Sequence, residues 1–169
     1  MEISSRRLKL LAATVETAAA EGQGPAHLAE LVGARVPDDW PPETLRNALP
    51  IFRRWHEEHP DWTGWLDWYA LRLDLAAPVL CGSAGFNGPP DERGVVEAGY
   101  SVLPAHQHLG LATEMVGALV SWACSQPGVR GIEAETTADN LPSIRVLERN
   151  RFRLIGPGPG SGSLRYRLP

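Results

Sequence analysis

The segments VVEAGYSVLP (95–104), QHLGLA (107–112), LATEMVGALVSWA (111–123), GIEAETT (131–137) and DNLPSIRVLERNRF (139–152) decide the fold. In order, they have the patterns of a strand closed by proline, a glycine turn, an amphipathic helix, a second strand and a second helix. A strand–helix–strand order predicts two neighbouring parallel strands joined by a crossover helix. We therefore expect the rest of the chain to be organised around the stretch from Glu97 to Phe152.

The glycine turn carries the chemistry of this stretch. A turn that opens directly into a helix leaves backbone N–H groups without partners at the positive end of the helix dipole, where a phosphate binds. Gly110 has no Cβ, so a ligand can approach its backbone closely. On these residues alone, a plain strand-to-helix turn is the alternative.

The rest of the chain extends the sheet and places helices before it. Residues 14–60 are expected to be mostly helical, with Thr14 as a cap and Pro50 interrupting the last helix, and to form a flap over one edge of the sheet. Alternating and apolar runs predict further strands at residues 8–12, 69–75, 79–87, 152–155 and 164–168. A chain of 169 residues with this organisation fits a single domain, residues 1–169.

Composition and charge exclude two classes of binding partner, nucleic acids and membranes. The net charge of −4 argues against a nucleic-acid binder, because phosphate neutralisation needs clustered Lys and Arg. No run approaches the roughly 20 apolar residues of a membrane span. Ser5–Lys9 (SRRLK) is similar to a twin-arginine export signal, but Glu16 interrupts the apolar run behind it. We expect a mature cytoplasmic protein that binds neither nucleic acid nor a membrane.

No metal site is expected. Cys81 and Cys124 lie in apolar segments without metal-ligand spacing, which favours two buried free thiols. In HEEH (56–59) the histidines are three residues apart and Pro60 follows directly. This spacing favours a solvated helix end over a zinc-protease helix.

Residues 79–156 resemble the GNAT acyltransferase superfamily. QHLGLA matches the pattern Q/R-x-x-G-x-A/G of that family's acyl-CoA pyrophosphate loop. The flanking motifs are similar to those of its ribosomal-protein N-acetyltransferase (Rim-type) branch. They are Glu97–Tyr100 and Val102–Pro104 in the preceding strand, Leu111–Glu114 at the helix start, and Asn140, Ser143, Val146–Arg149 and Phe152 in and after the second helix.

The resemblance implies a mixed α/β (α+β) fold whose mostly antiparallel central sheet splays between two parallel strands, with helices on both faces. It implies an N-acetyltransferase that moves acetyl from acetyl-CoA to a primary amine by direct attack, with an acyl-CoA-binding core at about residues 79–156. The acceptor would be a protein N-terminus or a small-molecule amine, and the protein a monomer or homodimer. The implied contacts of acetyl-CoA are Val102, Leu103, Gln107, His108, Leu109, Gly110, Leu111, Ala112, Asn140 and Ser143.

Glu97 is the candidate general base. It shares a strand face with Gly99 and Ser101, so its carboxylate has room to take a proton, through water, from an incoming ammonium. The deprotonation is needed because only the neutral amine is a nucleophile. A solvent-facing glutamate on a half-exposed strand is the alternative.

The start of the second helix is the other candidate catalytic region. The resemblance places Asn140 near the pantetheine arm and Ser143 near the sulfur, where it would hydrogen-bond the leaving thiolate. Asn140 also fits the role of helix N-cap. The family further implies that a backbone N–H near Val102–Leu103 donates to the thioester carbonyl.

The loop and the second helix depart from the family pattern. The loop has no Arg or Lys, so diphosphate affinity is expected to rest on backbone amides and to increase as His106 or His108 is protonated. Leu147 stands where much of the family has a tyrosine general acid, so that role is absent or passes to Ser143.

The end of the second helix also departs from the pattern. Asn150-Arg151 replaces the glycine that the family has before Phe152. Asn150 tolerates the left-handed conformation better than Arg151, which predicts a helix that ends one residue early.

The tryptophans of residues 55–68 are core or flap residues by default. The alternative is that Trp62 and Trp65 form a wall of the acceptor site, with Asp61 and Asp67 favouring a cation. Two other classes of function also remain. One is a non-catalytic acyl-CoA-binding module, and the other is an interaction protein that keeps the fold without a cofactor.

Overall fold

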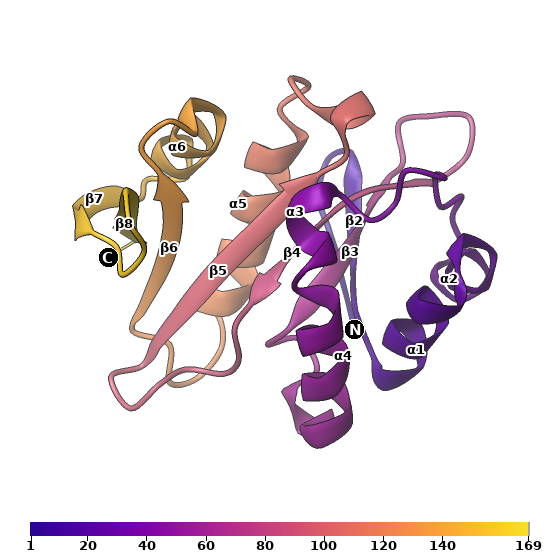
Figure 1. Cartoon of the computed structure of the whole chain (residues 1–169), viewed down its shortest axis with the longest axis horizontal. Coiled ribbons are helices and arrows are strands. Elements are labelled where there is room, and N and C mark those ends of the chain that lie inside the picture. The colour runs from indigo at the N-terminus through magenta and orange to yellow at the C-terminus, as the bar shows by residue number, and fades with distance from the viewer. Residues whose placement is uncertain (169) are drawn as a thin grey trace.

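The computed structural model describes residues 1–168 and contains one eight-stranded sheet (Figure 1). The strands are β1 (Glu2–Ser4), β2 (Leu8–Ala12), β3 (Asp67–Arg72), β4 (Val79–Phe86), β5 (Val95–Val102), β6 (Gly131–Thr137), β7 (Arg153–Pro157) and β8 (Ser163–Leu168). The helices are α1 (Val15–Gln23), α2 (Pro25–Val32), α3 (Glu43–Arg46), α4 (Leu49–Glu58), α5 (Leu111–Cys124) and α6 (Leu141–Arg149), with short 3₁₀ turns η1 (Pro60–Trp62) and η2 (Pro104–His106).

The strand order in the sheet is β1-β2-β3-β4-β5-β6-β8-β7. Among these strands β5 and β6 run parallel, and every other neighbouring pair is antiparallel. Helix α5 forms the crossover between the two parallel strands. The mixed, mostly antiparallel fold expected from the sequence is confirmed.

Two hydrophobic cores form because apolar side chains of the sheet alternate between its faces. In β3, Trp68 and Ala70 belong to the core that α5 and α6 cover. Tyr69 and Leu71 belong to the core that α2, α3 and α4 cover. Figure 1 shows α3 and α4 in front of the sheet and α5 behind it. The N-terminal helices therefore pack on a face of the sheet rather than along an edge.

Local signals in the N-terminal third act as the sequence predicts. The Thr14 hydroxyl accepts from Thr17 N–H (3.2 Å), and Thr14 N–H donates to the Thr17 hydroxyl (2.8 Å), so α1 begins with a reciprocal capping box. The helix expected to break at Pro50 is divided into α3, which ends at Arg46, and α4, which begins at Leu49. Strand β1 was not predicted, since three residues carry too little pattern.

Side-chain environments differ from expectation in two places. Cys81 is buried, and its thiol donates to Ala70 O (3.3 Å), but Cys124 is exposed at the end of α5. His56 is buried, and its Nε2 lies 2.8 Å from Asp67 Oδ1, so the expected solvated helix end is wrong for this residue. Asp67 is buried by the same contact, so it cannot contribute to a wall of the acceptor site that attracts a cation.

The end of α6 also differs from expectation. Arg151, not Asn150, has the left-handed conformation, with φ 67°. Asn150 Nδ2 instead donates to Thr113 O (3.2 Å) and Val146 O (2.9 Å), which ties α6 to α5. This tertiary contact fixes the backbone of Asn150 and leaves the left-handed position to the next residue.

Glu21 is a half-buried carboxyl on α1, at the packing surface of the N-terminal helices. It accepts hydrogen bonds from Trp40 Nε1 (2.6 Å) and Tyr69 OH (3.2 Å) beside a cavity of about 220 Å³ between α1 and α4. Burial raises the pKa of Glu21 from 4.5 to about 7, and the nearby Asp67 adds to this shift, while the bond from Trp40 opposes it.

Replacing Glu21 should stabilise the protein at alkaline pH. A carboxyl with a raised folded-state pKa costs nothing below pH 4.5 and destabilises increasingly as pH rises toward about 7. Glu21→Gln should therefore raise the free energy of unfolding by up to roughly 3 kcal/mol at about pH 8, and change little near pH 4.5. Urea unfolding at the two pH values measures this, with the exposed Glu30→Gln as the matched control. Equal gains at both pH values would contradict the prediction.

Candidate active site

The parallel strands β5 and β6 pair only along their first halves. Their register couples Val95–Ala98 with Gly131–Ala134. Strand β5 nevertheless stays paired with β4 as far as Val102, and β6 stays paired with β8 as far as Thr137. The two strands therefore separate in their second halves, as Figure 1 shows. The expected splay is confirmed.

The backbone N–H groups of Tyr100 and Val102 face this gap. Leu103 N–H donates to Cys81 O of β4 (2.9 Å), which marks the odd-numbered positions of β5 as those that face β4. Alternation along an antiparallel pair turns the even-numbered positions toward β6. Because Leu103 uses its N–H on β4 and its side chain is buried, Val102 is the better placed of the two expected carbonyl donors.

The glycine turn presents free backbone donors at the start of α5. Gly110 is the N-cap residue with φ 76°, and no side chain caps the helix. The first bond of the helix runs from Glu114 N–H to Gly110 O (3.2 Å). Within residues 1–168, the N–H groups from His108 to Thr113 make no hydrogen bond to the protein. These donors and the helix dipole can hold an anion here.

The side chains of the loop mostly support it from within. Gln107 Nε2 donates to Val102 O (3.0 Å), which links the loop to the end of β5. His106 is buried, and Arg72 Nη1 lies 3.4 Å from its Nδ1. Burial lowers the pKa of His106, and the charges of Arg72 and Arg35 lower it further. His106 is therefore neutral near neutral pH, so the expected gain in affinity on protonation can come only from the exposed His108.

Glu97 lies on the face of β5 that α3 and α4 cover. On this face Thr44 of α3 hydrogen-bonds Ser101 (2.7 Å between the hydroxyl oxygens), and a Cβ on Gly99 would contact nothing within 4 Å. Asn87 Nδ2 donates to Glu97 Oε1 (3.0 Å). Burial raises the pKa of Glu97, and the nearby Glu135 and Glu133 raise it further, against the opposing charge of Arg165. A half-buried carboxylate beside open space fits the expected base.

Two arginines of β8 neutralise the other acids on this face. Glu133, directly opposite Glu97 in the register, bonds Arg167 Nη1 (3.2 Å) and lies 3.5 Å from Arg165 Nη1. Glu135 accepts from Arg165 Nε (3.1 Å). Among residues 1–168, Glu97 has no ion-pair partner, so of the three glutamates that β5 and β6 place on this face it is the one free to accept a proton.

The opposite face of β5 meets the start of α6. Asn140 caps the helix, since its Oδ1 accepts from Ser143 N–H (3.2 Å). The Ser143 hydroxyl lies 2.8 Å from the hydroxyl of Tyr100, which also donates to Ser143 O (3.1 Å). Leu147, at the position of the expected helix tyrosine, is buried in the core. The strand thus supplies a phenol that the helix lacks.

Two residues near the gap were missed from the sequence. Burial raises the pKa of Tyr100 to about 12, and the bond with Ser143 opposes this, so Tyr100 carries its proton. Thr136 lies on β6 beyond its paired half, and its buried hydroxyl has no hydrogen-bond partner among residues 1–168. For Tyr100 a signal existed, because strand alternation places it opposite Glu97. For Thr136 the sequence carried none.

The two candidate tryptophans lie in different environments. Trp65 packs against Phe86 (5.7 Å between ring centroids) and Trp122 (4.9 Å), so it belongs to the core on the α5 side. Trp62 stacks on His59 (3.9 Å) and would lie 3.1 Å from a Cβ on Gly88. Trp62 therefore lies beside the turn that also carries Asn87, the partner of Glu97.

Residues 1–168 contain neither a candidate metal cluster nor a helix suited to crossing a membrane. No three His, Cys, Asp or Glu side chains gather closely enough there to hold a metal ion. None of the helices in this part of the chain combines the length and apolar character that crossing a membrane requires.

Sequence comparisons show the family of this chain. The family model described as "Acetyltransferase (GNAT) domain" matches residues 22–153. The uncharacterized N-acetyltransferase YjdG of Bacillus subtilis (strain 168) is 32% identical over 123 residues, covering 73% of this chain and 72% of YjdG.

Solved structures share the fold at lower identity. RimL, a ribosomal L7/L12 alpha-N-protein acetyltransferase in complex with CoA, has a TM-score of 0.68 and 19% identity over 99% of this chain and 97% of that chain. The microcin C7 self-immunity acetyltransferase MccE, in complex with acetyl-CoA and AMP, has a TM-score of 0.65 and is 13% identical, with 97% of this chain and 93% of that chain covered. The family match extends over most of the chain, and the chain therefore belongs to the GNAT family and is an N-acetyltransferase.

Proposed function

We propose that this enzyme moves acetyl from acetyl-CoA to a primary amine by direct attack, without a covalent enzyme intermediate. The observation that carries the proposal is the row of free amides from His108 to Thr113 beside the gap between β5 and β6. A diphosphate on these amides directs the attached pantetheine arm into the gap. RimL and MccE, which share the fold, hold CoA and acetyl-CoA respectively.

The two faces of β5 divide the chemistry. Glu97 and the open space at Gly99 lie on the face of α3 and α4, where the amine arrives. Tyr100 and Ser143 lie on the face of α5 and α6, where the thiol leaves. The amine reaches the thioester carbonyl in the gap from the Glu97 face. The attacking nitrogen and the leaving sulfur are therefore on opposite sides of the carbonyl carbon.

These groups, with water, account for each bond and proton that changes in the reaction. Glu97 takes a proton from the ammonium through water, and the neutral amine forms a C–N bond to the carbonyl carbon. The N–H of Val102 donates to the oxyanion. The nitrogen then loses its second proton to water, the C–S bond breaks, and Tyr100, hydrogen-bonded to Ser143, gives its proton to the thiolate. Exchange with water afterwards restores the proton of Tyr100 and removes the one on Glu97. Asn140 and the hydroxyl of Thr136 line the pantetheine arm.

We propose a primary ammonium as acceptor, either a protein N-terminus or a small-molecule amine. The acids Glu97, Glu133 and Glu135 gather on the acceptor face, and Arg165 and Arg167 compensate two of them. Residues 79–156 form the donor-binding core, and helices within residues 14–60 border the acceptor face through the contact of Thr44 with Ser101. RimL, which shares the fold, is an alpha-N-protein acetyltransferase.

Calorimetry and an amine panel test the function together. Saturating CoA should stabilise the protein by about 2–4 kcal/mol, because it binds the folded state alone. Acetyl-CoA should then acetylate at least one class among peptide N-termini, amino acids, polyamines and aminoglycosides. Binding without acetylation of any of these amines would instead indicate a non-catalytic acyl-CoA-binding module.

Glu97→Gln should change the pH dependence of kcat/KM. The rate of the wild-type enzyme should decrease as the pH is lowered, because Glu97 becomes protonated and can no longer act as a base. Since the pKa of Glu97 is raised, this decrease should begin at a pH closer to neutral than it would for an ordinary glutamate. The variant should be slower by about 100-fold near neutral pH. The difference should shrink at alkaline pH, where the amine is already neutral. Parallel pH profiles for the two proteins would remove Glu97 from the proton transfer.

Tyr100→Phe tests the acid on the other face. Loss of the phenol should lower kcat by about 10-fold or more, because the thiolate then leaves unprotonated. The Kd of CoA should change little, since the diphosphate contacts are intact. Ser143→Ala, which keeps the phenol and removes its partner, should have a smaller effect on kcat. An unchanged kcat in Tyr100→Phe would show that water, and not Tyr100, donates the proton to the leaving thiolate.

A further inference from the structure

A diphosphate in the loop requires compensation that the loop itself lacks. From Pro104 to Ala112 the chain has no Arg or Lys, and His106 is neutral. Two phosphates carry negative charge that backbone dipoles compensate only in part. A cation from another part of the chain, placed beside Gly110, would supply the missing compensation.

Arg7 lies beside the loop although it is distant in sequence. It belongs to the turn between β1 and β2, and its backbone is held from two directions. Its N–H donates to Glu114 Oε1 (2.6 Å), and its carbonyl accepts from Leu73 N–H (2.8 Å). The Ser5 hydroxyl of the same turn also donates to Glu114 Oε1 (2.9 Å). The turn is thus attached to the first turn of α5.

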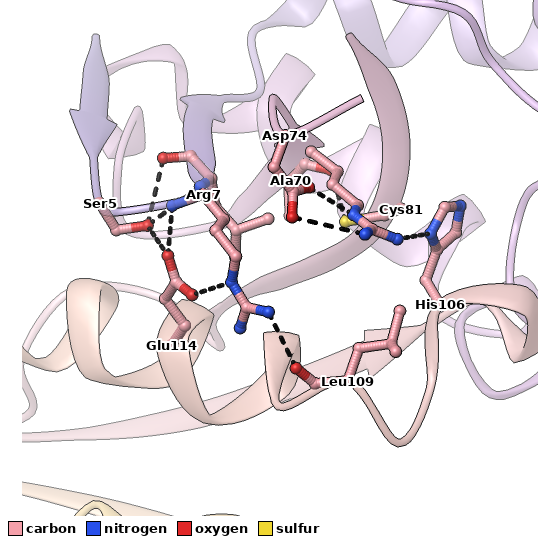
Figure 2. A network of polar contacts seen from close by, with 10 residues as sticks. Ser5, Arg7, Ala70, Asp74, Cys81, His106, Leu109 and Glu114 are labelled. Carbon is pink, nitrogen blue, oxygen red and sulfur yellow. Dashed lines mark hydrogen bonds and ion pairs between the residues drawn. The ribbon is translucent and has the colours of Figure 1, made fainter. Parts of the chain in front are cut away.

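The guanidinium of Arg7 is oriented by two further bonds (Figure 2). Its Nε donates to Glu114 Oε2 (2.8 Å), and its Nη1 donates to Leu109 O (3.0 Å). Among the hydrogen bonds of residues 1–168, none uses Nη2. Apart from Gly110 and its chain neighbours, that nitrogen is the nearest atom to a Cβ built on Gly110, at 3.7 Å. The free donor of a fixed guanidinium therefore lies where the backbone is open to a ligand.

We propose that Arg7 is a binding residue for the diphosphate of the acyl-CoA donor, with Nη2 donating to a phosphate oxygen above Gly110. The assignment rests on the proposed function and deepens it. Planar guanidinium groups form charge-assisted bonds to phosphate. Glu114 is the positioning residue, because its two oxygens hold the backbone and the Nε of Arg7.

The charge of Glu114 is consistent with this role. Burial favours its neutral form, but the hydrogen bonds from the backbone and side chain of Arg7 and from Ser5 lower the pKa of Glu114 overall. The carboxylate therefore remains ionised and keeps Arg7 in place. Arg72, the other nearby arginine, has its Nε and Nη2 on Asp74 (2.6 and 3.4 Å) and its Nη1 directed to His106. Arg72 supports the loop from within.

Arg7→Gln is the test, with Arg6→Gln as the matched control. Arg6 is exposed in the same turn and makes no hydrogen bond among residues 1–168. By calorimetry, Arg7→Gln should bind CoA about 10-fold more weakly than wild type, the value of one charge-assisted hydrogen bond. Arg6→Gln should bind CoA as wild type does.

A donor without phosphates separates binding from structure. S-Acetylpantetheine has the thioester but no diphosphate, so its kcat/KM should be the same in wild type and Arg7→Gln. If Arg7 only supports the fold, both donors should suffer in proportion, and that result would overturn the assignment. Equal CoA affinity in the Arg7 and Arg6 variants would overturn it as well.

A second variant covers the case in which Arg7→Gln does not fold. Arg7→Lys keeps the pair with Glu114 but loses the Nη2 donor, so CoA affinity should fall about threefold or more while S-acetylpantetheine is unaffected. CoA affinity equal to that of wild type would overturn the assignment. If wild-type protein binds no CoA at all, the proposed function fails, and the role of Arg7 fails with it.

Discussion

The site depends on the loss of backbone pairing between β5 and β6 after Ala98 and Ala134. Each strand continues along its other neighbour, so neither unfolds where the pair ends. The separation leaves the N–H groups of Tyr100 and Val102 without a strand partner. Buried backbone donors are rarely left unpaired, which makes such a gap a place for a ligand that brings its own acceptors.

The loop that would hold the diphosphate is built by distant parts of the chain. Gln107 is tied to Val102, His106 is tied to Arg72, and Leu109 is tied to Arg7. These contacts support the loop through its side chains and carbonyls and leave its N–H groups from His108 onward free. A loop fixed in this way has its donors preorganised, so less ordering is needed when an anion binds. The short β1–β2 turn therefore has a role that its length does not suggest.

Much of the fold could be predicted because its signals are local. The strand, glycine turn and helix of residues 95–123 follow from periodicity and from one glycine, and the interruption at Pro50 follows from proline chemistry. The face assignment of Glu97 follows from alternation alone. Family membership could likewise be predicted, because the motif of the loop and its flanking elements occur in one order, and the family match confirms it.

The features that sequence reasoning missed are set by tertiary contacts. Arg151 takes the left-handed position because Asn150 bonds Thr113 of another helix. Arg7 and Glu114 meet across more than a hundred residues, and Tyr100 meets Ser143 only because the two parallel strands separate where α6 begins. His56 is buried by Asp67, a partner that no helix pattern reveals. Register and packing decide each of these cases.

The placement of Glu97 and Tyr100 on opposite sides of one strand has a further consequence. Under the proposed function, the sheet would separate the two substrates, and each would reach the gap between β5 and β6 from its own face. Under the proposed function neither substrate would cover the approach of the other, so this arrangement imposes no obligatory order of binding.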